Sequence, residues 1–368
     1  MKTRNVKVFL SAAIVLLIGW GLVSCSKKKD ATPPVVKTEL TAAITADNAL
    51  IASTHEGVAA GNYLKGSQAP LIAVIAQAQV VADNTAATQI EVNAAIANLA
   101  AAVTTYGAAL VTAIDPTNLV GQWTFDEIAS AVADAAVKDY SGGNHDGALK
   151  AGHAFWAGSG VPTLVADRYG NAGKALHFDK GQNVEVPYNT SLNPAAAISI
   201  SLWFKQDVKA PVDPNQYMIA LNRWNGYKLQ IQDYPRVFFT GHVVKPAGDT
   251  TYYNYDQHLG GLTQGIWYNA VVTFGGGHEV FYLNGVLVYD WGALPAELLP
   301  GNIVSLAAKP VNLTFGQDLP TGKYSTDSAS PYYVNYGGYF SGTMDEIRIY
   351  KSALTASQVT SIYNLEKP

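Results

Sequence analysis

The chain has 368 residues, of which 48% are hydrophobic and 14% are charged, and its formal net charge at pH 7 is −4. This length is typical of two domains, and the apolar content is sufficient for a packed core, which excludes a largely disordered chain. The acidic balance argues against nucleic acid as a partner, and the single cysteine excludes a disulfide framework and a cysteine-based zinc site.

The first part of the chain has the pattern of an export signal. Basic residues precede an apolar stretch at 8–23, which is shorter than the roughly 20 residues of a membrane-spanning helix. The stretch ends in Leu22-Val23-Ser24-Cys25, which resembles the lipobox of bacterial lipoproteins. This resemblance implies a signal peptide at 1–24, acylation of Cys25, a tether at 25–37, and anchorage on the outer membrane of a diderm bacterium, at the cell surface or on the periplasmic face. An ordinary signal peptide with a chance cysteine is the alternative.

Residues 38–112 predict a small bundle of three helices. The segment is rich in alanine, and its apolar residues recur at spacings of three and four, as on one face of an amphipathic helix. We expect helices at about 39–54 and 70–82, and a third after Thr88, which forms a predicted capping box with Glu91. The segment resembles FIVAR-like three-helix modules of bacterial surface proteins, which implies a binding role. A spacer that lifts the next domain off the membrane is the simpler alternative.

From residue 119 onward the hydrophobic period changes to that of β-strands. About a dozen strand-like runs follow one another without intervening helices, which predicts a sandwich or jelly roll. The alternating run at 198–202 predicts a half-buried strand, and Asn284-Gly285 predicts a type I′ hairpin. Thr355 and Gln358 form a second predicted capping box, so we expect a short helix near the end of the chain.

Several short motifs in the β region appear in a characteristic order. They are GQWTFDE at 121–127, DYSG at 139–142, GKALHF at 173–178, ISLWF at 200–204, WY at 267–268, YLNG at 282–285 and GTMDEIRIY at 342–350. Together they resemble a LamG-like domain of the concanavalin A-like lectin/glucanase superfamily over residues 119–368. The resemblance implies an all-β jelly-roll sandwich, here preceded by the small three-helix bundle. Members of the family mostly bind carbohydrate or protein, and some relatives cleave glycans.

The sequence lacks the catalytic patterns of those glycan-cleaving relatives. Retaining glucanases of this fold carry a Glu-x-Asp-x-x-Glu pattern, because their reaction needs two carboxylates about 5 Å apart. No glutamates of the β region have that spacing. Jelly-roll lyases of the superfamily have Gln-Ile-His, whereas this chain has Gln230-Ile231-Gln232. We therefore expect no catalytic residues.

One structural Ca²⁺ is a further expectation. The family resemblance implies that Asp126 and Asp345 lie near a calcium site, and Asp139 is another candidate, because carboxylates and backbone carbonyls suit a hard cation. The alternative is that these side chains accept hydrogen bonds from N–H groups of turns and strand ends.

Loops rich in tyrosine, asparagine and aspartate are the candidate ligand-binding segments. The stretches 250–258 and 323–336 look inserted relative to the family pattern, and 222–227 is a third candidate. Aromatic rings beside hydrogen-bonding groups suit sugars, which have apolar faces and a rim of hydroxyls. The candidate binding residues are Arg223, Trp224, Tyr227, Tyr253, Tyr255 and Tyr333. The alternative is that some of these rings fill the sandwich core, as we expect for Trp203, Trp267 and Phe281.

The sequence thus predicts a non-catalytic surface lipoprotein that binds a polysaccharide or another glycan through aromatic loops. The alternatives are an adhesion module that binds a surface protein through the same loops and, less favoured, a glycan-cleaving enzyme.

Overall fold

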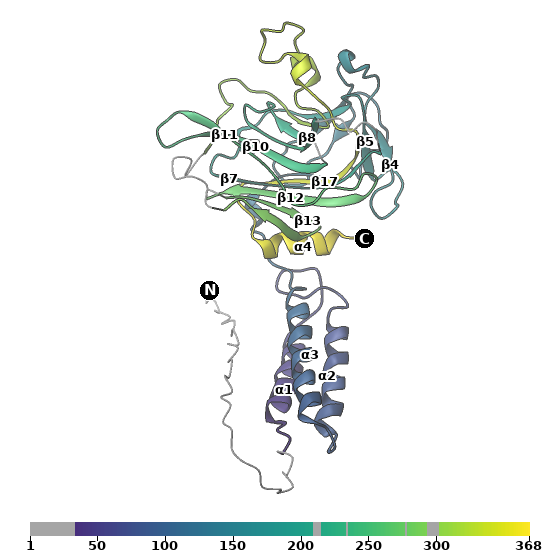
Figure 1. Cartoon of the computed structure of the whole chain (residues 1–368). Helices are drawn as coiled ribbons and strands as arrows, with labels where there is room; N and C mark the ends of the chain where they lie inside the picture. Colours follow the sequence, from purple (N-terminus) through teal and green to yellow (C-terminus); the bar gives the residue numbers. More distant parts are fainter. Residues whose placement is uncertain (1–33, 209–214, 233–234, 277, 293–301) are drawn as a thin grey trace.

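The structure, a computed structural model, describes residues 34–208, 215–232, 235–276, 278–292 and 302–368 (Figure 1). Cys25, the expected signal peptide and most of the expected tether lie outside the described residues. Among the described residues, no helix combines the length and the apolarity that crossing a bilayer requires.

Three helices pack together in the N-terminal part of the chain. They are α1 (Thr38–Ser53), α2 (Gln68–Asp83) and α3 (Gln89–Gly107). Each helix buries one apolar stripe, with Leu71 and Leu99 almost completely enclosed in the shared core. The predicted capping box is confirmed, because the Thr88 side chain accepts the Glu91 N–H and the Glu91 carboxylate accepts the Thr88 N–H at 2.7 Å. The predicted set of three helices is therefore confirmed.

The remainder of the described chain forms two antiparallel sheets. The eight-stranded sheet has the order β14-β13-β12-β7-β17-β5-β4, with β1 paired to β17; the nine-stranded sheet has the order β11-β10-β9-β8-β16-β6-β3-β2, with β15 paired to β10. The eight-stranded sheet comprises β1 (Leu119–Trp123), β4 (Thr163–Val165), β5 (Ala175–Phe178), β7 (Ala197–Gln206), β12 (Trp267–Gly275), β13 (His278–Leu283), β14 (Val286–Asp290) and β17 (Gly342–Tyr350). The nine-stranded sheet comprises β2 (Ala136–Val137), β3 (Gly147–Lys150), β6 (Asn183–Val186), β8 (Asn215–Leu221), β9 (Tyr227–Gln232), β10 (Arg236–Val244), β11 (Thr250–Asp256), β15 (Asn302–Ile303) and β16 (Leu313–Phe315). The predicted all-β sandwich is confirmed.

The main hydrophobic core lies between the two sheets. Successive side chains of a strand point to opposite faces, so alternate residues such as Ile200 and Leu202 of β7 and Leu229 of β9 meet in the middle. The large rings Trp123 and Phe315 pack edge to face there, with their centroids 4.9 Å apart. The core thus fixes which residues of each strand are left for the outer faces.

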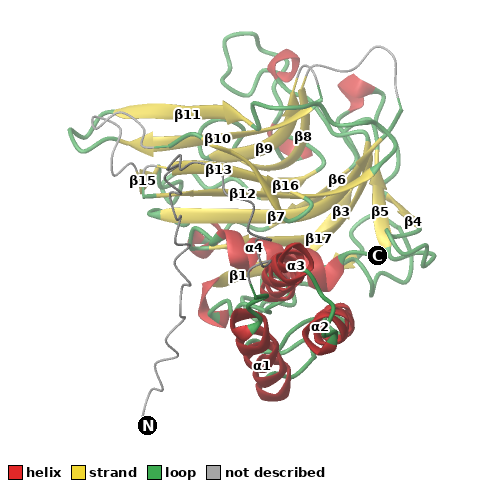
Figure 2. Ribbon diagram, turned by 60° about the horizontal axis from the view of Figure 1, so that its bottom comes forward, coloured by secondary structure: helices red, strands yellow, loops and turns green. Residues whose placement is uncertain are grey.

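The helix α4 (Ala356–Glu366) covers the outer face of the eight-stranded sheet (Figure 2). For this reason β7, expected to be half-buried, is buried on both faces. Its outward Ser199 donates to the Ser352 carbonyl at 2.6 Å and accepts from the Leu354 N–H at 2.9 Å. The predicted capping box of Thr355 and Gln358 is present at the start of α4.

The same helix contacts the segment that leads out of the helical bundle. The Thr112 N–H donates to the Ser361 hydroxyl at 2.8 Å, and the Gln358 side chain donates to the Ala113 carbonyl at 2.8 Å. Accordingly α4 lies between the eight-stranded sheet and the bundle, at the C-terminal end of the bundle (Figure 1).

Two local expectations had different outcomes. Asn284 and Gly285 join β13 to β14 with φ of 50° and 74°, which fits the predicted type I′ turn. The stretch 250–258, expected as an inserted loop, forms β11 instead, the edge strand of the nine-stranded sheet. Consequently Tyr253 and Tyr255 lie on the core side of the strand, whereas Tyr252 lies on the outer face.

Candidate functional site

The outer face of the nine-stranded sheet carries polar and aromatic side chains over β8, β9 and β10. In β9, Lys228 and Gln230 alternate with the core residue Leu229. Across the sheet, Lys228 pairs with Thr240 of β10, and Gln230 pairs with Tyr217 of β8. Because pairing keeps side chains on one face, these four residues lie together on the side away from the core.

Segments far apart in the sequence fold over this face and leave a cavity of about 570 Å³. We call it the outer-face cavity. It is lined by Trp156, Asn215, Tyr217, Trp224, Lys228, Asn335, Tyr336, Gly337, Gly338 and Tyr339. Its lining contains five aromatic side chains, two asparagines and one ammonium group, and no carboxylate.

A buried ion pair supports the wall of the cavity. Arg223 donates from Nε to Asp318 at 2.5 Å, and both side chains are buried. The remaining guanidinium nitrogens of Arg223 donate to the Pro331 carbonyl at 3.1 Å and the Tyr333 carbonyl at 3.4 Å. These carbonyls belong to residues 331–339, which cover the sheet here and which we call the covering segment. Arg223 therefore fixes the covering segment over the sheet, although the Arg223 side chain does not itself line the cavity.

Close approach of the covering segment depends on glycine. A Cβ added at Gly338 would lie 2.7 Å from the Asn215 carbonyl oxygen and 2.9 Å from the Tyr217 ring. Gly338 also donates its N–H to Asp318 at 3.2 Å, and the Tyr324 hydroxyl donates to the same carboxylate. Burial raises the pKa of Asp318, and the Arg223 guanidinium opposes this shift.

The aromatic rings of the wall contact one another at close range. The rings of Trp156 and Tyr324 meet edge to face at 4.9 Å, and Trp156 approaches Tyr339 at 5.6 Å. Trp224 lies 4.8 Å from the guanidinium carbon of Arg223. Trp156 is therefore held by two neighbouring rings and Trp224 by the guanidinium group of Arg223.

Lys228 is the cation of the cavity. Its ammonium group donates to the Gln230 side-chain oxygen at 2.7 Å, and Gln230 donates in turn to the Asn215 side chain at 2.8 Å. The ammonium nitrogen lies 5.0 Å from the Tyr217 ring centroid and 5.7 Å from that of Phe238. Burial lowers the pKa of Lys228 to about 8, an effect that Asp318 opposes and Arg223 reinforces.

Residues 178–360 match the family model of the concanavalin A-like lectin/glucanases superfamily. The β domain belongs to this superfamily. No curated protein matches the chain.

Several solved structures resemble this chain at low sequence identity. The binding domain of paraclostridial mosquitocidal protein 1 is 17% identical with a TM-score of 0.45, and the match covers 68% of this chain and 52% of that one. Domain 4 of a GH43 extracellular arabinanase from Geobacillus stearothermophilus, solved with arabinotriose, is 18% identical with a TM-score of 0.45, over 67% of this chain and 98% of that one. The receptor-binding domain of a botulinum neurotoxin C/D mosaic serotype is 14% identical with a TM-score of 0.45, over 68% and 52%. The present chain thus spans about half the length of the two toxin domains.

Two of the predicted binding residues lie in the core of the concanavalin A-like domain. Tyr227 is fully buried and donates its hydroxyl to the Leu192 carbonyl at 2.8 Å. Tyr253 is 1% exposed and packs on Phe274 at 5.0 Å. Both occupy inward positions of their strands, so the expectation that they bind a surface ligand is wrong for a reason of strand parity.

The remaining predicted binding residues do not lie together at one site. Trp224 lines the outer-face cavity. Tyr333 lies in the covering segment, where its hydroxyl accepts from Asn335 at 2.9 Å, and it is not among the lining residues. Tyr255 packs on Trp291 at 4.4 Å, away from the cavity lining. The structure therefore brings only Trp224 of the predicted set into the cavity, with Arg223 behind it.

Sequence reasoning did not single out Trp156, Tyr217 or Lys228. Lys228 is the residue with a visible signal, because Tyr227–Gln232 alternates apolar and polar residues and so places Lys228 with Gln230 on the outward face of β9. Polar side chains that point outward from a strand but are buried by other segments are candidates for contact with a ligand. Trp156 gives no such signal, since only the fold brings η2 (Ala154–Trp156) to this sheet.

Two of the three aspartates predicted for calcium, Asp139 and Asp345, are engaged by protein groups. Asp139 is buried and accepts hydrogen bonds from the N–H groups of Gln122, Ser141 and His145 at 2.8–3.0 Å, which together hold its pKa well below the usual range against the effect of burial. Asp345 is paired with Arg168 at 2.6 Å. Within the described part of the chain, no group of three or more His, Cys, Asp or Glu side chains is arranged to hold a metal ion. Asp139 and Asp345 therefore fit the alternative of hydrogen-bonded and ion-paired aspartates, whereas Asp126 is exposed and acts electrostatically on Asp345. A calcium ion held partly by backbone carbonyls stays a prediction.

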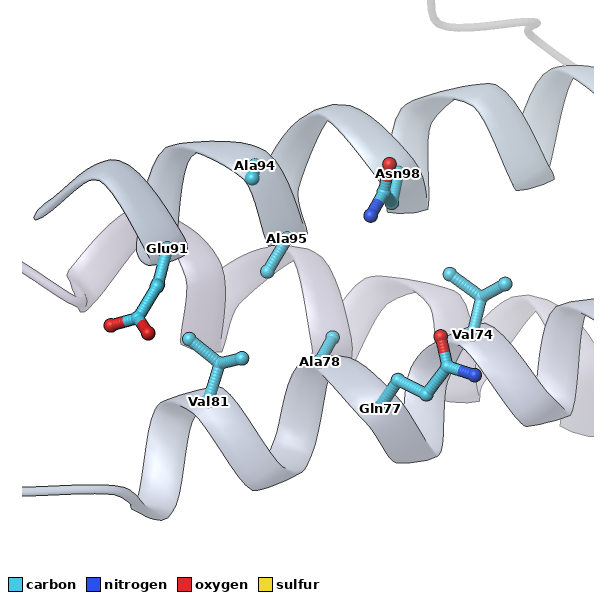
Figure 3. A pocket seen from close by; sticks show the side chains of 8 residues that line it. All are labelled: Val74, Gln77, Ala78, Val81, Glu91, Ala94, Ala95 and Asn98. Atoms are coloured by element: carbon cyan, nitrogen blue, oxygen red, sulfur yellow. The ribbon is translucent and has the colours of Figure 1, made fainter. Parts of the chain in front are cut away.

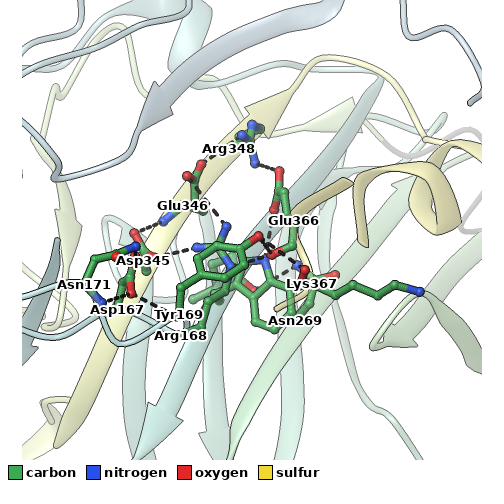
Figure 4. Close-up of polar contacts among 12 residues, drawn as sticks. Asp167, Arg168, Tyr169, Asn171, Asn269, Asp345, Glu346, Arg348, Glu366 and Lys367 are labelled. Atoms are coloured by element: carbon green, nitrogen blue, oxygen red, sulfur yellow. Dashed lines mark hydrogen bonds and ion pairs between the residues drawn. The ribbon is translucent and has the colours of Figure 1, made fainter. Parts of the chain in front are cut away.

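Asp345 belongs to a network of charges beneath α4 (Figure 4). Arg168 lies between Asp345 and Glu346, at 2.6 and 3.9 Å, while Arg348 contacts Glu346 at 2.8 Å and also Glu366 of α4. Every carboxylate of this cluster faces a guanidinium group. The cluster therefore attaches α4 to the sheet, through the contact of Arg348 with Glu366.

A smaller cavity of about 260 Å³ lies between α2 and α3 (Figure 3). Its lining is mainly small and apolar, with Ala78, Ala95 and Val81 among its members. The one carboxylate there, Glu91, is engaged in the capping box of α3. This groove offers few polar groups for orienting a ligand, so the outer-face cavity is the stronger candidate.

Proposed function

We propose that this chain is a non-catalytic carbohydrate-binding protein whose site is the outer-face cavity. The observation that carries the proposal is the lining of that cavity. Rings such as Trp156, Trp224 and Tyr336 stand beside the amide side chains of Asn215 and Asn335. Saccharides combine apolar C–H faces with hydroxyl groups, so a site for them needs both kinds of partner.

The cavity has a size and openness suited to one or two sugar units of a longer chain. Its volume of about 570 Å³ falls within the range of about 300–1,000 Å³ that small-molecule sites occupy. Tyr336 at its edge is 53% exposed, so a ring is available to a ligand that continues past the cavity.

Binding without cleavage follows from the chemistry of the same lining. Glycoside hydrolysis by the common route needs two carboxyl groups, one acid and one nucleophile or base. The outer-face cavity is lined by neither aspartate nor glutamate, and the position that is His in the lyase pattern is Gln232 on β9. We expect the protein to retain polysaccharides and to release no sugar from them.

Affinity electrophoresis of the full chain against a panel of soluble polysaccharides tests this function. At least one polysaccharide should retard the protein, and Trp224→Ala should weaken that binding about tenfold or more, because a central ring is removed. Tyr140→Ala is the matched control, since Tyr140 is 50% exposed and does not line the cavity. Retardation that survives Trp224→Ala, or the appearance of reducing ends, would contradict the proposal.

We further propose that the protein is held on a membrane, on the outer membrane of its cell, by lipid on Cys25. The support is the sequence Leu22-Val23-Ser24-Cys25 after an apolar stretch. Two or more acyl chains are enough for stable anchorage, whereas one is marginal. The helical bundle would then act as a spacer, since the 19 residues of α3 correspond to about 28 Å.

Cell fractionation tests the anchor. The protein should be found in the membrane fraction and should carry the mass of a diacylglyceryl group on its mature N-terminus. Cys25→Ser should release it into the soluble fraction, while Ser26→Ala should not. An unmodified Cys25, or membrane retention of Cys25→Ser, would favour the ordinary signal peptide.

A further inference from the structure

Lys228 is a buried cation without a carboxylate partner in the described part of the chain. Only 8% of the residue is exposed, and it takes part in none of the ion pairs. The nearest buried acid that acts on it electrostatically, Asp318, is bonded to Arg223 and Tyr324. Buried ammonium groups are rare unless they are paired, so an unpaired one at the base of a cavity calls for an explanation.

The hydrogen bonding of Lys228 also leaves capacity for a ligand. An ammonium group has three N–H donors, and among the described residues the only acceptor is the side-chain oxygen of Gln230. The rings of Tyr217 and Phe238 stabilise the charge through their faces, but they accept no conventional hydrogen bond. Two donors therefore remain for an acceptor that enters the cavity.

We propose that the outer-face cavity selects an acidic saccharide, with the carboxylate of a uronic acid unit paired with the Lys228 ammonium group and the sugar ring held by the aromatic wall. This inference rests on the proposed function and names the substrate class of the same site. A single point charge matches the single negative charge of a uronate, and Lys228 lies among the lining residues that also include Trp224 and Tyr336.

The pairing explains selectivity against neutral sugars. A hydrogen bond to a charged group is stronger than one between neutral groups, and in a partly dry cavity the advantage of the opposite charge is retained. We expect an acidic polysaccharide to bind about tenfold or more tightly than its carboxyl-reduced form, in which each carboxylate has become a primary alcohol.

The charge of Lys228 is set by groups from several elements. Arg223 from the turn after β8 and Asp318 from the segment after β16 act with opposite signs, whereas Tyr217 of β8 and Thr240 and Phe238 of β10 are uncharged neighbours. Burial lowers the pKa of Lys228 to about 8. The ammonium group is thus present at neutral pH and largely lost well above pH 8, so the preference for acidic sugars is expected to fade there.

The experiment measures binding of the full chain to uronate polysaccharides, each paired with its carboxyl-reduced form. Polygalacturonate, alginate, glucuronoxylan and hyaluronan are the probes, at about pH 6.5 and about pH 9.5. Lys228→Met should abolish the difference in binding between the preferred acidic form and its reduced form. Lys228→Arg keeps the charge at both pH values, so it should retain the preference at the higher pH, where the wild type loses it.

The outcomes separate the two proposals. If no polysaccharide of either form binds, the proposed function fails. If acidic and reduced forms bind equally well, or if Lys228→Met keeps the difference between them, the proposed function stands and this inference is overturned. Binding restricted to sulfated polysaccharides would also overturn it. A preference for a carboxylated chain that requires the charge at position 228 supports it.

Discussion

The two outer faces of the sandwich differ in how buried charge is compensated. Over the eight-stranded sheet, Arg168 and Arg348 face Asp345, Glu346 and Glu366, and α4 closes over them. Over the nine-stranded sheet, the ammonium group of Lys228 has no carboxylate partner among the described residues, and it lines a cavity. A balanced cluster serves the attachment of one element to another, whereas an unbalanced charge beside a cavity is available to a ligand.

The largest expected effect is on the balanced face. Arg168→Met removes the ion-pair partner of the buried Asp345, so the free energy of unfolding should fall by about 3–5 kcal/mol, while Glu346 keeps its contact with Arg348. Chemical denaturation measures it. Lys138→Met, which breaks an exposed pair with Asp146, should cost about 0–1 kcal/mol. Equal effects of the two substitutions would mean that the network beneath α4 is no more important than a surface pair.

The second prediction concerns a buried carboxyl group that has no ion-pair partner within the described residues. Glu279 of β13 is fully buried, and neither of its carboxyl oxygens has a hydrogen bond of ordinary geometry within the described residues, although the Tyr255 backbone lies near enough to oppose the shift. Burial raises the pKa of Glu279 well above its usual value of 4.5. The carboxyl is therefore protonated in the folded chain at a pH at which it ionises in the unfolded chain.

The sign of the pH dependence follows from that difference. The unfolded chain releases this proton as the pH rises above about 4.5 while the folded chain keeps it, so the contribution of Glu279 to stability falls over that range until the folded pKa is reached. Glu279→Gln should abolish this part of the pH dependence, and Glu279→Met should raise the free energy of unfolding at neutral pH by about 1–3 kcal/mol. Denaturation curves at several pH values would show it, and a destabilised Glu279→Met variant would contradict it.

The smallest expected change in stability is that of Lys228→Met, and it distinguishes the two outer faces most directly. Lys228→Met should leave stability at neutral pH unchanged or raise it by about 1 kcal/mol, because it removes an unpaired buried cation. The gain should shrink between about pH 8 and pH 10.5, where the folded chain has lost the proton and the unfolded chain still holds it. A marked loss of stability in Lys228→Met would mean that Lys228 serves the fold itself.

The sequence was sufficient to predict the architecture of both domains. Helical and strand periods distinguish the two regions, and short-range signals such as Thr88 with Glu91 and Asn284 with Gly285 predict local structure that is present. The edge strand β11 was harder to predict, because it consists of threonine, tyrosine, asparagine and aspartate, a composition that resembles a loop. An edge strand has a partner on one side only, so its pattern is less constrained.

The candidate site could be predicted only in part. Trp224 stands in a turn next to a strand, where an aromatic residue is conspicuous, and it does line the cavity. Tyr253 could not be assigned to the core without the parity of β11, since a shift of one residue exchanges the faces. Trp156 and Gly338 meet Tyr217 only through the fold, and no spacing along the chain indicates it.

The position of α4 determines how a mechanical load would pass through the molecule. The helix is the last one of the chain, yet it lies between the sheet and the bundle, where Ser361 and Gln358 hold the segment at 110–113. The outer-face cavity is on the opposite side of the sandwich from this joint. Tension applied by a captured polymer would thus cross both sheets and reach the bundle through the backbone before β1, where α4 holds the joint by hydrogen bonds. Without α4, the joint between the bundle and the β domain would lose these hydrogen bonds, and the two parts would be free to change their relative orientation under load.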